Sequence, residues 1–152
     1  SDEKKDLAPL LKAKEKINYF LNTYPESEYA LDLRFKKDLI INQLAAKELF
    51  VARFYISTKK WVPAINRLKV IVKDYDQTIF IEEALHRLVE INYHLGLENE
   101  AKEYAKILGY NYNSSEWFEQ SYKILNKDYE IKKITKSKKE KGFIEKILKK
   151  IR

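Results

Sequence analysis

The chain has 152 residues, of which 45% are hydrophobic and 35% charged, with three Gly, three Pro and no Cys. This composition favours a nearly continuous run of helices, and the lack of cysteine excludes disulfides, zinc–thiolate sites and thiol catalysis within the chain. No apolar run approaches the roughly 18–20 residues of a membrane span, and no signal peptide is recognisable. The net charge of +7 comes from the C-terminal end, because residues 123–152 hold 12 Lys/Arg against 4 Asp/Glu, a net of +8, and residues 1–122 have a net of −1.

Apolar residues recur at helical intervals along most of the chain, and this spacing predicts a succession of helices. These helices cover residues 6–23, 29–42, 44–58, 61–75, 79–95, 98–108 and about 113–125. The stretch from 29 to 58 contains neither Gly nor Pro. Its two helices are therefore expected to be continuous, or bent near Gln43.

Turn-forming and capping residues set the expected helix ends. Tyr24-Pro25 should stop the first helix, and Lys59-Lys60 should turn the chain before the helix 61–75. The expected N-caps are Ser27, Thr78 and either Asn113 or Ser114. The glycines expected to end helices in the left-handed conformation are Gly96 and Gly109.

The segment from Ala45 to Tyr75 carries the residue pattern of a tetratricopeptide (TPR) repeat. Counting Ala45 as the first of 34 positions, the eighth, eleventh, twentieth and twenty-fourth are Ala52, Tyr55, Ala64 and Leu68. Small residues at such positions let two helix axes approach closely. The pattern recurs at irregular but matching intervals of 51 and then 37 residues, in the alanines Ala13, Ala64 and Ala101 and in the tyrosines Tyr24, Tyr75 and Tyr112.

This recurrence predicts an all-α fold, a TPR-type α-solenoid in which antiparallel helix pairs form a right-handed superhelix. Residues 1–125 would form the repeat domain, with the B helix of a truncated repeat, an extra helix, two full repeats and a capping helix. Residues 126–152 would form a Lys-rich extension with a short amphipathic helix. Because the first helix takes a B position, its partner would precede Ser1, and we expect the natural protein to extend further upstream.

Few residues suggest a metal-binding, cofactor-binding or catalytic site. His86, Glu90 and His94 step by four along one predicted helix, but the two histidines would lie about 12 Å apart along the axis, too far to bind one ion. No metal or cofactor is therefore expected. No serine lies in a nucleophile-elbow sequence, and three scattered glycines cannot form a phosphate-cradling loop, so no enzymatic activity is expected. The histidine–glutamate row should instead line the concave face of the repeats.

The Lys-rich tail leaves several interpretations open. Its last residues place Phe143, Ile144, Ile147, Leu148 and Ile151 at helical spacing between lysines. Such a segment could lie on an anionic membrane surface, or dock on another protein or back on the repeats. It could bind nucleic acid through its lysines, although it lacks interleaved aromatic residues to stack on bases, or it could simply be a solvated tail.

Several short runs along residues 6–125 resemble one known family. They are Leu44-Ala45-Ala46-Lys47-Glu48, Arg53-Phe54-Tyr55, Ala64-Ile65-Asn66-Arg67, Glu82-Glu83-Ala84-Leu85, Leu88-Val89-Glu90, Leu95-Gly96-Leu97, Glu100-Ala101, and Leu108-Gly109-Tyr110-Asn111-Tyr112 to Trp117. These runs, and the inserted extra helix, are similar to the C-terminal half of the BamD (ComL-type) family, the TPR lipoproteins of the outer-membrane β-barrel assembly (BAM) machinery. The sequence departs from the family's Tyr-Pro at Tyr75-Asp76 and Tyr112-Asn113, and the segment after about residue 126 has no counterpart in the common pattern.

The resemblance implies a non-catalytic scaffold on the periplasmic face of the bacterial outer membrane. A lipid anchor, on a family cysteine that this chain lacks, would hold the full-length protein in the inner leaflet. The implied partner is a periplasmic POTRA domain of BamA, with other BAM accessory lipoproteins as additional partners and no nucleic acid.

The residue carried over from the family is Arg67, in the Asn66-Arg67 pair, which would form an ion pair with a BamA carboxylate. Lys73 and Asp74 on the same helix are further candidates. The simpler interpretation is that Arg67 caps or solvates its own helix. The alternative function is a peptide-binding TPR adaptor, in which the groove residues would be Arg53, His86, Glu90 and Tyr93.

Overall fold

The computed structural model describes residues 7–126 and arranges them as six α-helices. The helices are α1 (Ala8–Thr23), α2 (Ala30–Ser57), α3 (Trp61–Asp74), α4 (Ile81–His94), α5 (Glu98–Asn111) and α6 (Glu116–Leu125). Within this described range no residue belongs to a β-strand. The expected all-α fold is confirmed.

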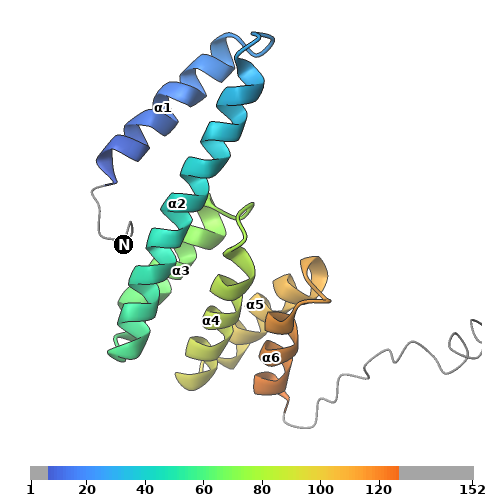
Figure 1. Cartoon of the computed structure of the whole chain (residues 1–152). Coiled ribbons are helices and arrows are strands. Elements are labelled where there is room, and N and C mark those ends of the chain that lie inside the picture. Colours follow the sequence, from blue (N-terminus) through green and yellow to red (C-terminus); the bar gives the residue numbers. More distant parts are fainter. Residues whose placement is uncertain (1–6, 127–152) are drawn as a thin grey trace, which may run out of the picture.

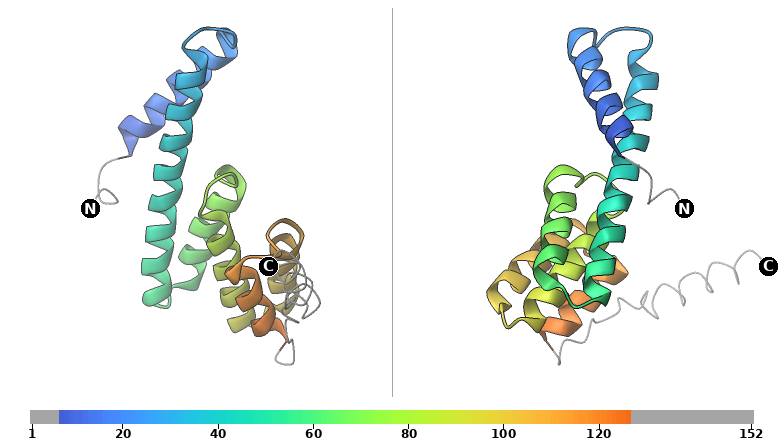
Figure 2. Two further views of the ribbon diagram at one scale, coloured as in Figure 1. Left: turned by 45° about the vertical axis from the view of Figure 1, so that its right-hand side comes forward. Right: turned by 90° about the vertical axis from the view of Figure 1, so that its left-hand side faces the viewer.

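Helices that follow one another in the chain run antiparallel and pack side by side (Figure 1). α1 lies against α2, α3 packs on both α2 and α4, and α6 covers α4 and α5. Figure 2 shows that α1 and the first half of α2 form an arm that projects from the other helices. The largest cluster of buried residues lies where α2, α3 and α4 meet.

Small residues bring these helices together as expected. Ala52 of α2 and Ala64 of α3 have no exposed surface, and neither does Leu68, which packs in the same cluster. Close approach at alanine maximises contact between the larger side chains around the crossing. By contrast, α1 contains no fully buried residue, since α2 is its principal neighbour, and the predicted repeat position Ala13 is only half-buried.

α2 is one continuous helix of 28 residues, with no interruption near Gln43. At 1.5 Å per residue it is about 42 Å long. Its apolar residues lie on two faces, one of which packs in the core and the other of which remains exposed. The exposed large apolar side chains of α2 are Leu31, Phe35, Leu39, Phe50 and Phe54.

The two glycines expected to end helices have different roles. Gly96 follows α4 with a φ of 77°, in the left-handed region that glycine adopts without a steric cost, so this prediction is confirmed. The expectation for Gly109 is wrong, because α5 continues through it to Asn111. A Cβ at Gly109 would lie 2.9 Å from Tyr122 Oη and 3.0 Å from Phe118 Cε2. Gly109 is therefore the point where α6 approaches α5 closely.

None of the expected N-caps takes that position, because α2, α4 and α6 are preceded by Tyr29, Phe80 and Ser115. Thr78 does not cap α4, because its buried hydroxyl donates to the carbonyl of Tyr75 at 2.7 Å and the helix begins at Ile81. α6 is capped by Ser115, one residue beyond Ser114 and two beyond Asn113, the expected caps; the Ser115 hydroxyl accepts from Phe118 N at 3.1 Å. Ser27 accepts from Tyr29 N at 3.3 Å, in the turn before α2.

The predictions for the Lys-rich extension fall, except at Asn126, outside the described residues. Among the helices that are described, none is both long enough and apolar enough to traverse a bilayer.

Candidate functional site

Two surface hollows contain some of the residues singled out from the sequence. The first, the α3 hollow, has a volume of about 300 Å³ and lies between α3 and the second half of α2. Its lining residues are Tyr55, Val62, Pro63, Asn66, Arg67 and Val70. The expected pair Asn66-Arg67 therefore lies on an indented surface. Lys73 and Asp74 are exposed in the last turn of α3 and do not line the hollow.

Arg67 forms an ion pair with the neighbouring helix. Its Nη1 lies 3.2 and 3.3 Å from the two carboxylate oxygens of Glu48 in α2, and donates to both. The Glu48 side chain is only 16% exposed, whereas that of Arg67 is 46% exposed. The half-buried carboxylate thus has a partner, and the guanidinium reaches solvent. This arrangement differs from the expectation that Arg67 only caps or solvates its own helix.

Glu48 also affects the core tyrosine at the end of α3. Burial raises the pKa of the Tyr75 hydroxyl, and the negative charges of Glu48 and Asp74 raise it further. The Lys14 ammonium of α1 lies 5.3 Å from the centroid of the Tyr75 ring, within the range of a cation–π contact. Tyr75 therefore connects the arm with the core and lies near the charge of Glu48.

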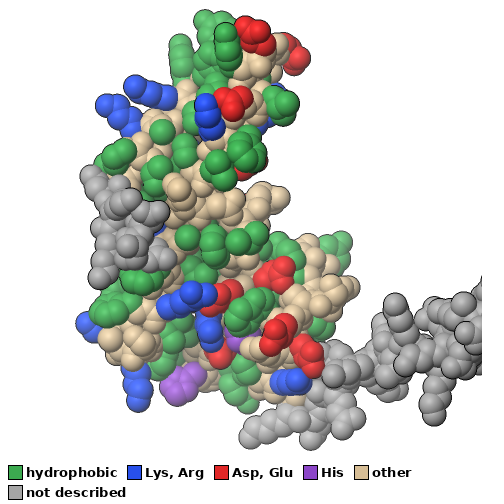
Figure 3. Space-filling model, viewed as in Figure 1, with side chains coloured by type: hydrophobic (Ala, Val, Ile, Leu, Met, Phe, Trp, Pro, Cys, Tyr) green, Lys and Arg blue, Asp and Glu red, His purple; other side chains and the backbone are tan. Residues whose placement is uncertain are grey.

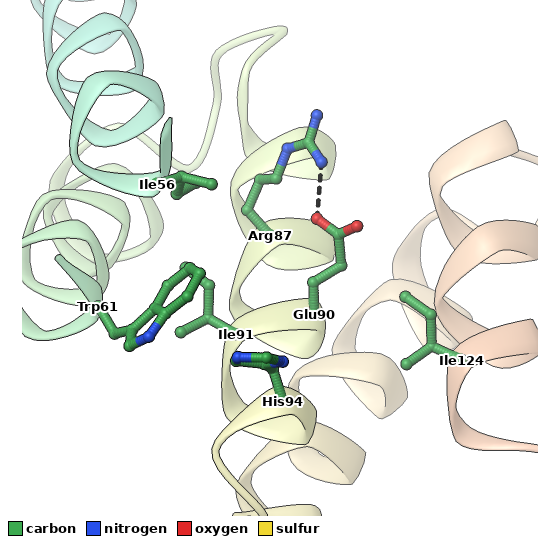
Figure 4. A pocket seen from close by; sticks show the side chains of 7 residues that line it. All are labelled: Ile56, Trp61, Arg87, Glu90, Ile91, His94 and Ile124. Atoms are coloured by element: carbon green, nitrogen blue, oxygen red, sulfur yellow. Dashed lines mark hydrogen bonds and ion pairs between the residues drawn. The ribbon is translucent and has the colours of Figure 1, made fainter. Parts of the chain in front are cut away.

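The second hollow, the α4 hollow, has a volume of about 380 Å³ and lies across α4 (Figure 4). Its lining residues are Ile56, Trp61, Arg87, Glu90, Ile91, His94 and Ile124. They come from α2, α3, α4 and α6, and apolar side chains form the wall on both sides of the Arg87–Glu90 pair. The His94 ring lies against the Trp61 ring, with their centroids 5.0 Å apart.

A chain of charged side chains links α2 with α4 beside the α4 hollow. Arg53 donates through Nε and Nη2 to the two oxygens of Glu83, a bidentate arrangement, and this bond raises the pKa of Arg53. Arg87 Nε lies 3.6 Å from Glu83, and Arg87 Nη1 donates to Glu90 at 2.6 Å. Figure 3 shows basic and acidic side chains close together over this part of the molecule. The two arginines and the two glutamates of this chain of charged side chains neutralise one another.

Glu90 is held in its charged form. The imidazole of His86 and then the guanidinium of Arg87 lower the pKa of Glu90 to about 2, although desolvation acts in the opposite direction. Glu90 is 37% exposed. It therefore presents a permanent negative charge to the hollow at any pH near neutrality.

His86 is buried, with 1% of its surface exposed, and so it does not line the groove as expected. Its Nδ1 lies 2.8 Å from the hydroxyl of Ser121 in α6, and its Nε2 lies 3.6 Å from Glu90. The indole of Trp117 lies against the His86 ring, with their centroids 5.1 Å apart. A serine, a histidine and a glutamate thus lie in a row, but Ser121 has no exposed surface, so no substrate can reach its hydroxyl. The row connects α4 to α6.

The four residues expected to line a groove, Arg53, His86, Glu90 and Tyr93, therefore do not lie on one surface. Arg53 and Glu90 belong to the exposed charge network. Tyr93 packs with Val89, Ala101 and Ala105, on the side of α4 that faces α5.

Comparison with known proteins decides the family. The sequence model of the family described as "YfiO: Outer membrane lipoprotein" matches residues 1–108. This chain belongs to the YfiO family. The family is one of outer membrane lipoproteins, which agrees with the outer-membrane location expected from the resemblance.

Curated relatives of this YfiO-family chain carry the name outer membrane protein assembly factor BamD. The chain is 38% identical over 130 residues to that of Rickettsia prowazekii, covering 86% of this chain and 51% of the relative. It is 36% identical over 125 residues to that of Caulobacter vibrioides, covering 82% and 41%. The chain spans about half the length, or somewhat less, of the curated relatives it matches.

The sequence of this YfiO-family chain did not lead us to Arg87, to the contact of Trp61 with His94 or to the position of Ile124. Arg87 lies four residues after Glu83 and three before Glu90, a spacing that signals side-chain pairing on one helix and could have identified it. The contact of Trp61 with His94 and the position of Ile124 depend on how α3 and α6 pack against α4. No local pattern predicts these contacts.

Proposed function

We propose that this chain is a scaffold of the outer-membrane β-barrel assembly machinery that corresponds to the C-terminal half of a BamD protein and binds the periplasmic POTRA region of BamA. The observation that supports this most directly is Arg67. It is a half-exposed guanidinium on the edge of an indented surface, in a chain 38% identical to a BamD.

The chemistry of Arg67 suits such a contact. Arginine presents five N–H donors in a planar fork, and Glu48 engages only Nη1. Among residues 7–126, no group accepts a hydrogen bond from the other two guanidinium nitrogens. A carboxylate of the partner could therefore bind Arg67 while Glu48 holds it. Asn66 adds an amide at the same surface, while Lys73 and Asp74 would act only as outlying contacts.

The test is binding of the 152-residue chain to the isolated POTRA domains of BamA from the same source, by calorimetry. We expect Arg67→Glu to abolish binding and Glu90→Ala to change it little. Because Arg67→Glu also places two carboxylates together, loss of binding alone could reflect damage to the α2–α3 contact.

The double variant Glu48→Arg/Arg67→Glu separates the two explanations. It restores an internal ion pair with its charges exchanged, and reverses the charge offered to the partner. The proposal requires that this variant folds and still fails to bind. If it binds as the wild type does, Arg67 acts only within the fold and the assigned interface is wrong. Lys69→Glu, an exposed charge reversal on the same helix, is the matched control and should bind normally.

The α4 hollow favours a second function, a peptide-binding adaptor. Its apolar walls flank Glu90, a carboxylate that stays charged, and such a surface could hold an extended basic or apolar peptide. In that case Glu90→Ala should weaken binding and Arg67→Glu should not. Screening a peptide array with both variants distinguishes the two functions, and no loss with either variant would reject both sites.

A further inference from the structure

The α3 hollow combines a charged edge with an apolar wall. On α3, Val62, Asn66 and Val70 follow each other at intervals of four residues, and Pro63 and Arg67 form a parallel row beside them. Residues spaced in this way lie on one face of a helix. The ring of Tyr55 from α2 completes the lining.

One residue of the apolar lining is largely exposed, and the others are partly buried. Val62 lines the hollow and is 67% exposed. A volume of about 300 Å³ equals the liquid volume of about ten water molecules, enough for one large apolar side chain. Water in contact with valine, proline and tyrosine carbon is released favourably when an apolar group replaces it.

The charges define what else the occupant must carry. Arg67 is a cation with two donor nitrogens that point to no acceptor in the described part of the chain. Glu48, the nearest anion, is 16% exposed and already engaged. The hollow therefore attracts a carboxylate at its Arg67 edge. Glu48 would repel a carboxylate only if the two lay close together.

We infer that the α3 hollow recognises a protein segment in which an acidic residue adjoins a large apolar residue, with the carboxylate on Arg67 and the apolar side chain in the hollow. This deepens the scaffold function proposed above and rests on it, since the segment would belong to the POTRA region. Two contacts of different kinds also explain how such a surface can be selective. An exposed ion pair alone contributes little affinity, whereas an apolar anchor in a pocket can dominate an interface.

The apolar contact is tested independently of the charge. Asn66→Phe places a ring in the middle of the hollow, and Val62→Ser removes the most exposed part of its wall. Both positions are exposed, so the fold should tolerate the changes. We expect Asn66→Phe to weaken binding to the POTRA domains by more than about tenfold and Val62→Ser by about three- to tenfold. The matched control is Ile79→Ser, an 83% exposed apolar residue outside the hollow, which should bind as the wild type does.

A second measurement locates the contact directly. With valine and isoleucine methyl groups labelled, the NMR signals of Val62 and Val70 should shift when POTRA domains are added, while that of Ile79 should not. If Arg67→Glu abolishes binding but both hollow variants bind normally and the valine signals stay unchanged, the inference is overturned and the scaffold function stands. If Arg67→Glu has no effect, the scaffold interface itself is wrong.

Discussion

Replacing Glu90 with glutamine should change how the stability of the fold depends on pH. The pKa of Glu90 is about 2, against an ordinary value of 4.5. This difference of about 2.5, at 1.36 kcal/mol for each pKa unit, corresponds to at most about 3.4 kcal/mol. Because the side chain is 37% exposed, solvent screening reduces this to about 1–2 kcal/mol.

The sign follows from the direction of the shift. A carboxylate whose pKa is lowered by folding stabilises the folded state above its unfolded pKa, and this contribution is lost as the pH falls through the folded pKa. The free energy of unfolding of the wild type should therefore exceed that of Glu90→Gln by about 1–2 kcal/mol near pH 7. The difference should stay constant down to about pH 5 and fall by more than half by about pH 3.

Urea unfolding followed by circular dichroism measures this difference at each pH. The matched control is Glu98→Gln, which removes a carboxylate that is 61% exposed and paired on the surface with Lys102. It should cost less than about 0.5 kcal/mol at any pH. A wild-type advantage over Glu90→Gln that is independent of pH, or no larger than that of the control, would refute the reasoning about the Glu90 network.

Other substitutions test the packing and the helix ends. Ala64→Leu adds volume where no surface is exposed, so it should cost about 1–3 kcal/mol and lower the melting temperature by roughly 2–4 °C for each kcal/mol. An unchanged melting temperature would contradict the close α2–α3 approach. In Gly96→Ala the new Cβ meets no atom within 4 Å, but the residue must adopt a φ of 77°. The change should therefore lower the free energy of unfolding in urea by about 1 kcal/mol, and no loss of stability would contradict this end of α4. Ser115→Ala removes the N-cap of α6 and should cost about 1 kcal/mol, detected as faster hydrogen exchange at Phe118 N.

The sequence predicts most of the helices because apolar spacing and helix-ending residues act within a few residues along the chain. The positions of α1, α3 and α4 follow from apolar spacing, and Gly96 ends α4 as its freedom at positive φ suggests. Gly109 was misassigned for a physical reason. A glycine that ends a helix and a glycine that makes room for a neighbouring helix look the same in sequence, and only the contact with Phe118 and Tyr122 separates them.

The candidate sites show the same limit. The family resemblance singles out Arg67, but nothing in the sequence indicates that Glu48, nineteen residues earlier, pairs with it. The sequence places His86 on the same helical face as Glu90, yet the burial of His86 depends on α6, which supplies Ser121 and Trp117. Side chains that meet across helices are set by packing angles that no short-range pattern encodes.

The unbroken helix α2 has a mechanical consequence. Its first half belongs to the arm with α1 and its second half to the packed helices around Ala52. Between them there is no glycine, proline or loop residue to absorb a change of backbone angle, so the helix transmits force as a stiff lever. Over a length of about 42 Å, a tilt of about 5° at one end displaces the other by about 4 Å. A small tilt of the packed helices around the second half of α2 would therefore be enlarged at the tip of the arm.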